Sequence, residues 1–418
     1  MIDPPVQVNI DAHRLSDDLQ TLATFSAATL DGGVTRRAWS KEYIAAQHWL
    51  VGRFQEAGLT TEVDAAGNIW GRWAVGDLPA IVVGSHIDSV PSGGSFDGCL
   101  GVLGGLEAVR SLQESGHTPG RQIWVVAWME EEGSAFGAAL FGSRAIVGAL
   151  DLDAAQHLQN LDGEPLRTVL EDAGCSWADL ATLPRRLSEI CAYLELHIEQ
   201  GPLLEDKQIP VGVVTHIVGL ECGRVQLTGQ ANHAGGTPMD LRRDAAVGAA
   251  RAMLAIRNLA VTRGVRATTG QLELRPGAIN VVPGYAEFSL DARHHDPIVL
   301  EEYIADLIAE LNQIAAADGI TVSYSNVYTL APVPLDKRLQ DQLRLTCAHL
   351  SIQSTDLVSG AGHDAMVLAP RVPTAMLFVP SHAGISHSPE EFTSPADCAR
   401  GVHVLACTLA SLSHASPS

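Results

Sequence analysis

The sequence predicts a two-domain α/β protein, and three observations carry this prediction. The chain has 418 residues, which exceeds the size of one ordinary hydrophobic core. Short apolar runs that end in polar clusters alternate with helix-like segments, the pattern of a largely parallel sheet with helical crossovers. The stretch 213–330 has a different sequence pattern, in which apolar and polar residues alternate as in strands with one buried face. We therefore expect a main domain formed by residues 1–212 and 331–418 and an inserted α+β domain formed by residues 213–330.

The main domain is expected to begin with helices and to continue with buried strands. Leu15, Leu19 and Leu22 share one helical face, and Gly58 ends the second helical segment. The strand-like runs are AIVVGSH (80–86), QIWVVAWME (122–130), AYLELHIEQ (192–200) and TAMLFVPSH (374–382). Ligands of such sheets bind at the carboxyl ends of the strands, which is where these runs become polar.

The inserted segment combines alternating strands with two long helices. RVQLTG and EFSLDARH alternate with period two, and a helix is expected after Met239. A second helix carries Ile304, Leu307, Ile308 and Leu311 at helical spacing.

Charge and cysteine content exclude several functional classes. The formal net charge of −21, without a concentrated basic stripe, argues against nucleic acid or an anionic membrane as a partner. No apolar run approaches the roughly 20 residues of a membrane span, and the first residues lack the features of a signal peptide, so we expect a soluble, cytoplasmic protein. Seven scattered cysteines without a C-x-x-C pair argue against a disulfide framework or a thiolate zinc site.

Histidines and carboxylates follow the predicted strand ends in a pattern typical of a metal centre. The candidates are His86, Asp97, the run 130–132 (Glu-Glu-Glu), His197 and His387. A single such residue is more often structural or solvated, but their coincidence at strand ends favours metal binding. Three adjacent glutamates repel one another unless a cation or a shared proton is present, so one can bind metal while another moves protons.

The loop GSHIDSVPSGGSFDGCLG (84–101) places several of these groups together. We expect His86 and Asp97 to be ligands, and Asp88 to accept the second N–H of the His86 imidazole and so fix its orientation. Glycines would let the backbone bring Asp97 back towards His86. These glycines are Gly93, Gly94 and Gly98.

Eight motifs, taken in order, resemble one known family. They are GSHIDSVPSGGSFDGCLGV, MEEEGSAFG, HIEQGP, GQANHAGGTPM, GAINVVPG, DARH, SGAGHDAM and ISHSPEE. From about residue 12 to about residue 410 the chain resembles the hydantoinase/carbamoylase group of the M20 metallopeptidase-like amidohydrolases. This group includes N-carbamoyl-L-amino acid hydrolases, β-ureidopropionases and allantoate amidohydrolases. The resemblance implies a metallopeptidase-like α/β catalytic domain whose inserted α+β domain is a lid and forms a homodimer.

The resemblance also implies two divalent metal ions, with zinc expected first and manganese, cobalt or nickel as alternatives. Asp97 would bridge the ions, His86 and His197 would complete one site, and Glu132 and His387 the other. Glu131 would be the general base. Two cations suit this chemistry because they polarise a poorly electrophilic carbonyl and lower the pKa of water from about 15.7 towards about 7. A positioned carboxylate adds roughly 10²–10⁴-fold.

By the same resemblance, Gln200, His233, Asn280 and Arg293 are implied substrate contacts. A guanidinium binds a carboxylate bidentately, so Arg293 suits the carboxylate of the substrate. His233 is implied to reach the substrate of the neighbouring subunit and to stabilise the oxyanion. His363 and His382 are given no ligand role.

The leading functional hypothesis is hydrolysis of the carbamoyl C–N bond of N-carbamoyl-L-amino acids. Allantoate amidohydrolase is the first alternative, because both substrates present a ureido group and a carboxylate. An M20 aminoacylase or dipeptidase is disfavoured by His197 and Gln200. A metal-free binding protein would be expected to lose ligands or the base, yet every position is filled, and a serine hydrolase is weakly supported because no G-x-S-x-G motif is found.

Overall fold

The computed structural model describes residues 8–414, and these form two compact units. The main unit consists of the chain up to Thr215 and again from Pro334, and the inserted unit consists of His216–Val333. The architecture is mixed α/β, which confirms the predicted fold class. The sequence-based boundaries, 213 and 330, fall close to these limits, whereas the roles assigned to the two parts stay predictions.

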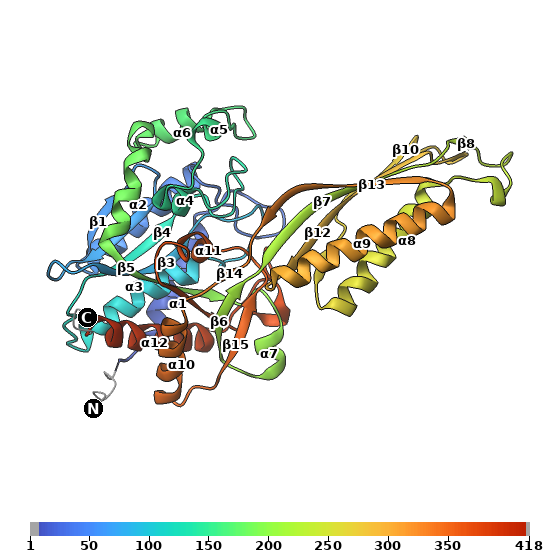
Figure 1. Ribbon diagram of the computed structural model, residues 1–418. Helices are drawn as coiled ribbons and strands as arrows, with labels where there is room; N and C mark the ends of the chain where they lie inside the picture. Colours follow the sequence, from blue (N-terminus) through green and yellow to red (C-terminus); the bar gives the residue numbers. More distant parts are fainter. Residues whose placement is uncertain (1–7, 415–418) are drawn as a thin grey trace. The chain divides into compact units, whose positions relative to one another are not determined.

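A nine-stranded sheet forms the centre of the main unit (Figure 1). Its order is β1 (Thr60–Val63), β2 (Ile69–Trp73), β4 (Ile123–Trp128), β3 (Ala80–His86), β5 (Ile190–Ile198), β16 (Thr374–Val379), β6 (Val211–Ile217) and β14 (Val333–Pro334), and β15 (Ser354–Ser359) pairs with β6. The four apolar runs singled out in the sequence are β3, β4, β5 and β16. They lie side by side and pair in parallel, so their carboxyl ends meet at one edge.

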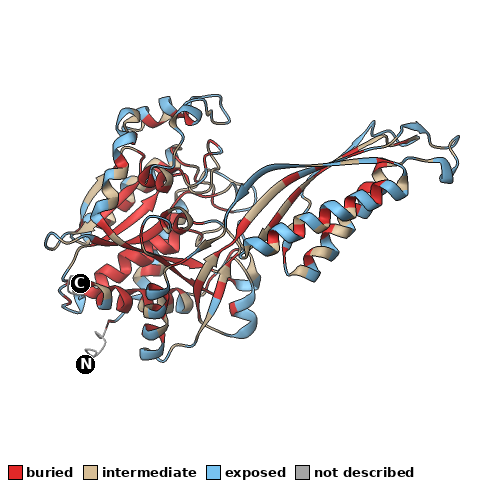
Figure 2. Cartoon of the chain, in the orientation of Figure 1, coloured by how far each residue is buried: buried red, intermediate tan, exposed pale blue. Residues whose placement is uncertain are grey.

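Helices cover both faces of this sheet (Figure 1). The helices of the main unit are α1 (Ala12–Thr24), α2 (Lys41–Glu56), α3 (Cys99–Glu114), α4 (Phe141–Val147), α5 (Leu152–Ala155), α6 (Leu166–Asp172), α7 (Leu203–Lys207), α10 (Lys337–His349), α11 (Asp364–Leu368) and α12 (Pro395–Ser413), with 3-10 segments η1 (Trp177–Glu189) and η3 (His382–Gly384), and not all of them lie on the sheet. Figure 2 shows that the central strands and α3 are almost wholly buried. The segment that leads into α3 is therefore held by packing on several sides, which makes it a rigid place for a site.

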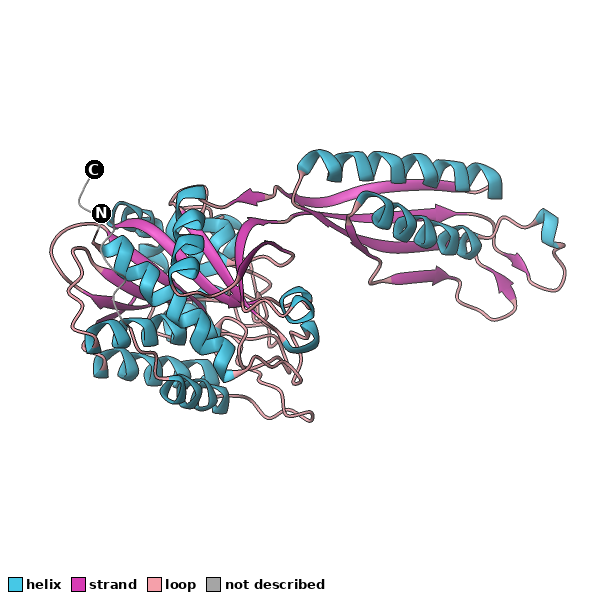
Figure 3. Cartoon of the chain, turned by 90° about the horizontal axis from the view of Figure 1, so that it is seen from below, coloured by secondary structure: helices cyan, strands magenta, loops and turns pink. Residues whose placement is uncertain are grey.

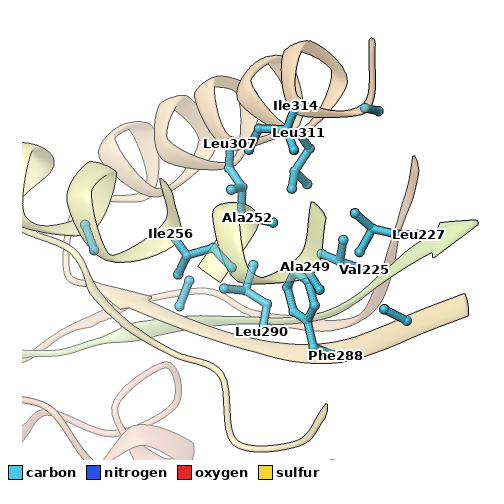
Figure 4. Close-up of a cluster of buried hydrophobic side chains, with 14 of the residues drawn as sticks. Val225, Leu227, Ala249, Ala252, Ile256, Phe288, Leu290, Leu307, Leu311 and Ile314 are labelled. Carbon is cyan, nitrogen blue, oxygen red and sulfur yellow. The ribbon is translucent and has the colours of Figure 1, made fainter. Parts of the chain in front are cut away.

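The inserted unit is a five-stranded antiparallel sheet with two helices on one face (Figure 3). The strand order is β10 (Leu272–Arg275), β12 (Tyr285–His294), β7 (Gly219–Thr228) and β13 (Thr321–Leu330), with β9 (Arg266–Thr268) also on β12. Alternate residues of β7 and β12, such as Val225, Leu227, Phe288 and Leu290, pack against α8 (Ala245–Arg263) and α9 (Pro297–Asp318) (Figure 4). A separate ladder pairs β8 (Asn232–His233) with β11 (Val281–Val282), and the short η2 (Met239–Leu241) follows β8 in the chain.

Within residues 8–414, no helix combines the length and the apolar character that crossing a membrane requires.

Candidate metal centre

The parallel strands bring the predicted ligands to one edge of the main sheet. His86 is the last residue of β3, and His197 lies one residue before the end of β5. Glu131 and Glu132 follow β4, which is the neighbour of β3. His387 comes from the loop after η3, beyond the end of β16.

Asp97 lies between two groups of possible ligands, one at each carboxylate oxygen. Its Oδ1 is 3.1 Å from His197 Nε2 and 3.7 Å from His86 Nε2. Its Oδ2 is 3.1 Å from His387 Nε2, and this imidazole nitrogen is 3.6 Å from Glu132 Oε2. In each group of three residues, one candidate ligand atom per residue lies within 4.8 Å of the others. The structure therefore brings all five predicted ligands together, in two sets that share Asp97.

Strained and glycine-dependent backbone supports this arrangement. Gly98 has a φ of 66°, and a Cβ on it would lie 2.5 Å from the His86 ring, so only glycine fits between Asp97 and α3. Glu130 and His387 also adopt left-handed conformations, with φ of 56° and 55°. Non-glycine residues in this region cost free energy and cluster at functional sites.

The position of Asp88 corrects one expectation. The imidazole Nδ1 of His86 lies 3.1 Å from the main-chain oxygen of Asp88, whereas it is 3.6 Å from the carboxylate. The Asp88 carboxylate instead accepts the main-chain N–H groups of Glu131, at 3.3 Å, and Glu132, at 3.1 Å. The backbone carbonyl thus orients His86, because the carboxylate is turned towards the two amides that follow β4.

Burial and neighbouring charges shift the pKa values of the carboxylates of the centre. Although burial opposes it, contact with the imidazoles of His197, His387 and His86 holds the pKa of Asp97 well below its usual range. Burial raises the pKa of Glu132 to about 7, with Asp97 adding to the effect. Burial likewise raises the pKa of Glu131 well above its ordinary value. A cation among these groups would relieve the repulsion between the carboxylates.

The donor set fits two divalent cations. Imidazole nitrogens and carboxylate oxygens suit zinc, manganese, cobalt and nickel. His86 and His197 each direct one nitrogen at a main-chain carbonyl, His86 at Asp88 and His197 at Ile198 over 2.9 Å. Each therefore leaves Nε2 facing Asp97, which is the orientation that metal-binding histidines usually have.

A further buried cluster, formed by Glu195, His197 and His363, adjoins the centre but is already hydrogen-bonded. Glu195 accepts from Ser85 Oγ at 2.8 Å and from the N–H of Ala365 at 3.0 Å. Both nitrogens of His197 face the partners described above. This cluster therefore forms a polar wall of the centre rather than a separate metal site.

His363, which was given no ligand role, lies in that wall. Its Nε2 is 2.9 Å from Ser359 Oγ, and its ring centroid is 4.5 Å from that of His197. Burial lowers its pKa well below the usual value, so it is neutral at physiological pH. His382 instead contacts the exposed Glu205, with Nδ1 and Oε1 2.7 Å apart.

The predicted substrate contacts fall into separate groups. Gln200 belongs to the centre, because its amide donates to Asp97 Oδ2 over 3.1 Å. In the inserted unit, His233 and Asn280 are exposed and adjacent through the β8–β11 ladder. Arg293, in β12, donates to both carboxylate oxygens of Asp291, at 2.8 and 3.0 Å.

The structure does not bring Arg293 near His233 and Asn280. Asn280 precedes the first residue of β12, Tyr285, whereas Arg293 is the last residue but one of that strand. At about 3.3 Å per residue, Tyr285 and Arg293 are separated by about 25 Å. A small molecule bound to Arg293 thus cannot also touch His233 or Asn280 of the same inserted unit.

Glu391 is a buried member of this region that sequence reasoning did not single out. Its carboxylate accepts the main-chain N–H of Asp97 at 3.0 Å. The segment SPEE contains two adjacent glutamates that the sequence alone does not distinguish, and in the structure Glu390 is exposed whereas Glu391 is buried.

Comparison with known proteins gives one family match and several similar amidohydrolases. The family model described as peptidase family M20/M25/M40 matches residues 82–411. The chain is 38% identical over 398 residues to an N-carbamoyl-L-amino-acid amidohydrolase of Paenarthrobacter aurescens, covering 94% of this chain and 96% of the relative. It is 36% identical to an allantoate amidohydrolase of Bacillus subtilis, covering 96% and 98%. A crystal structure of an amidase of the hydantoinase/carbamoylase family from Burkholderia multivorans superposes with a TM-score of 0.89 at 36% identity, covering 96% of this chain and 98% of that chain.

Proposed function

Because the chain belongs to peptidase family M20/M25/M40, we propose that it is a dinuclear metal-dependent amidohydrolase that cleaves the carbamoyl C–N bond of an N-carbamoyl-L-amino acid. The observation that carries this proposal is the position of Asp97, whose two oxygens face two different sets of ligands. Water is consumed, and the products are the amino acid, carbon dioxide and ammonia. The relatives named as N-carbamoyl-L-amino-acid amidohydrolases support this choice of substrate.

In the proposed centre, His86, His197 and Asp97 would hold one ion, and Asp97, Glu132 and His387 would hold the other. When bound, they supply charge that polarises the carbonyl and lowers the pKa of water.

Glu131 is proposed as the general base. Its Oε2 lies 3.6 Å from His86 Nε2, at the edge of the ligand cluster, and the side chain is largely buried. A carboxyl whose pKa is raised by burial holds a proton more readily, so Glu131 can take a proton from the attacking water and deliver it to the leaving nitrogen.

Arg293 is proposed to bind the carboxylate of the substrate, and Gln200 to contact the substrate beside Asp97. The bidentate pair with Asp291 holds the guanidinium of Arg293 in a defined orientation.

His233 and Asn280 are proposed to act on the substrate of a second copy of the chain. The separation along β12 supports this, because these residues and Arg293 cannot reach one small molecule within one inserted unit. Helix α8 also exposes Val247, Leu254 and Val261 at seven-residue intervals, an apolar stripe suited to helix packing in the predicted homodimer.

Allantoate is a second candidate substrate, supported by the 36% and 37% identity to allantoate amidohydrolases. A panel of allantoate and carbamoyl derivatives of small, aromatic and β-amino acids, assayed for ammonia release, separates the two. Activity that disappears with a chelator and returns with zinc, manganese, cobalt or nickel is expected. Metal-loaded protein that releases no ammonia from any of these compounds would contradict the proposed function.

A further inference from the structure

Glu391 is a buried carboxylate whose two oxygens have different partners. Oε1 accepts the main-chain N–H groups of Phe96, at 2.9 Å, and Asp97, at 3.0 Å. Oε2 accepts the hydroxyl of Ser386 at 2.7 Å. The side chain thus joins the loop that carries Asp97 to the segment that carries His387.

A second path closes this connection on the side chain of Asp97. The amide nitrogen of Gln200 donates both to Ser386 Oγ, at 3.2 Å, and to Asp97 Oδ2, at 3.1 Å. Asp97 Oδ2 is the oxygen that faces His387. Glu391 is therefore connected to Asp97 in two ways. It accepts the main-chain N–H of Asp97 directly, and it is linked to the Asp97 side chain through Ser386 and Gln200.

The loop is shaped to receive this carboxylate. A Cβ on Gly94 would lie 2.0 Å from Glu391 Oε1, so a side chain at position 94 would displace Glu391. The neighbouring Glu390 is exposed, and its main-chain N–H donates to Ser388 Oγ; among the described residues, no hydrogen bond joins its side chain to the loop. Position 391 thus differs from position 390 in burial and in contacts, although the residue type is the same.

The two proposed cation sites differ in their need for such support. His86 and His197 are buried, lie on central strands and are each oriented by a main-chain carbonyl. The side chain of His387 is 49% exposed, and its backbone is strained in the left-handed region. The site that includes His387 thus has the less rigid ligand and depends more on the segment 386–391.

We propose that Glu391 is a positioning residue that sets the spacing between Asp97 and His387 and so determines the affinity of the cation site formed by Asp97, Glu132 and His387. The inference rests on the dinuclear centre proposed above. Glu391 touches neither substrate nor cation and acts through Asp97 and Ser386.

The test is a zinc titration of metal-depleted full-length protein against a chromophoric chelator, comparing the native chain with Glu391→Gln and Glu390→Gln. The amide at position 391 directs an N–H at Ser386, which already accepts from Gln200, so the hydroxyl of Ser386 loses its acceptor. We expect one of the two zinc ions to bind about 10–100-fold more weakly in Glu391→Gln, the usual effect of losing a partner that orients a ligand. The other ion should bind as in the native chain, and Glu390→Gln should match the native chain at both sites.

Two zinc ions bound by Glu391→Gln as tightly as by the native chain would overturn the inference, and so would equal weakening of both ions. A native chain that binds fewer than two ions would instead contradict the proposed function. If circular dichroism shows that Glu391→Gln does not fold, Ser386→Ala is the second test, because it removes the hydroxyl that joins Glu391 Oε2 to Gln200 and leaves the contacts of Oε1 in place. It is expected to weaken the same single ion, and unchanged binding of both ions would reject the inference.

Discussion

Asp88 Oδ2 accepts the main-chain N–H of Glu132 over 3.1 Å, and Oδ1 accepts that of Glu131. One buried carboxylate on the loop after β3 thus fixes the backbone of the proposed base and of a proposed ligand on the loop after β4. The two loops are neighbours because β3 and β4 pair in parallel.

Asp88→Asn tests this link. In the native chain, each carboxylate oxygen of Asp88 accepts one main-chain N–H. In the variant, the NH2 group of the asparagine replaces one of these oxygens and cannot accept, so one of the two contacts is lost. We expect kcat and metal affinity to fall together by about 10–100-fold, as when a partner that orients metal ligands is removed. Steady-state kinetics at saturating zinc and chelator competition measure both quantities. The exposed Asp77→Asn is the matched control, and a native kcat in Asp88→Asn would show that the link is unimportant.

Glu131→Gln separates proton transfer from metal binding. The substitution keeps shape but removes the proton acceptor, so we expect two metal ions per chain and a kcat lowered by about 10²–10⁴-fold. Elemental analysis and ammonia release from a carbamoyl amino acid measure the two effects. Glu132→Gln is the contrast, because it should lose metal as well as activity. A fully active Glu131→Gln enzyme would remove this residue from its role.

Glu130 predicts a pH dependence of stability. Its Oε1 accepts from the N–H groups of Ala135 and Phe136, and burial raises its pKa to about 8, with the nearby Asp88 adding to the rise. The folded chain then binds this proton more tightly than the unfolded chain, whose glutamates have a pKa of about 4.3. The contribution is fully present below about pH 4.3 and is lost as the pH rises through about 8.

Glu130→Gln keeps the acceptor oxygen and cannot ionise. We expect the melting temperature of Glu130→Gln minus that of the native chain to increase as the pH is raised from 5 to 8. Thermal unfolding at several pH values, with both proteins in the same metal state, measures this difference. A difference that does not change with pH would mean that Glu130 keeps its ordinary pKa in the folded chain.

The main sheet and the clustering of the proposed ligands could be predicted because their signals are local. The apolar runs that became β3, β4 and β5 end in or directly before side chains of the centre, whereas His387 comes from a loop beyond β16, and parallel pairing brings the ends of these strands together. The contacts of Asp88 could not be predicted, because the sequence does not say whether a carboxylate turns towards an imidazole or towards a neighbouring amide. Glu391 was missed because burial distinguishes it from ordinary surface residues, and burial follows from packing between segments distant in sequence.

The apolar stripe on α8 predicts an oligomeric state. Leu254 lies between Val247 and Val261 on this stripe and is exposed in the single chain. If the stripe packs against a second copy, Leu254→Glu buries an unpaired charge, and we expect the dimer dissociation constant to rise at least about a hundredfold. Sedimentation velocity over a range of concentrations measures this. Leu161→Glu, at an exposed leucine of the main unit, should leave association unchanged, and a stable Leu254→Glu dimer would exclude the stripe as the interface.

Complementation between two inactive chains tests whether His233 acts across the dimer. A His233→Ala chain retains Glu131, and a Glu131→Gln chain retains His233, so each lacks a different part of the proposed site. If His233 serves the neighbouring chain, a heterodimer contains one complete site. Random pairing of two-fold dimers then restores about a quarter of the native activity per chain.

The mixture is made by co-expression, and ammonia release is compared with that of each single variant. His233→Ala paired with a chain carrying both substitutions is the control and should regain nothing, since no dimer in it holds a complete site. Confirmed heterodimers without restored activity would assign His233 to its own chain, which the separation of about 25 Å between Tyr285 and Arg293 along β12 argues against.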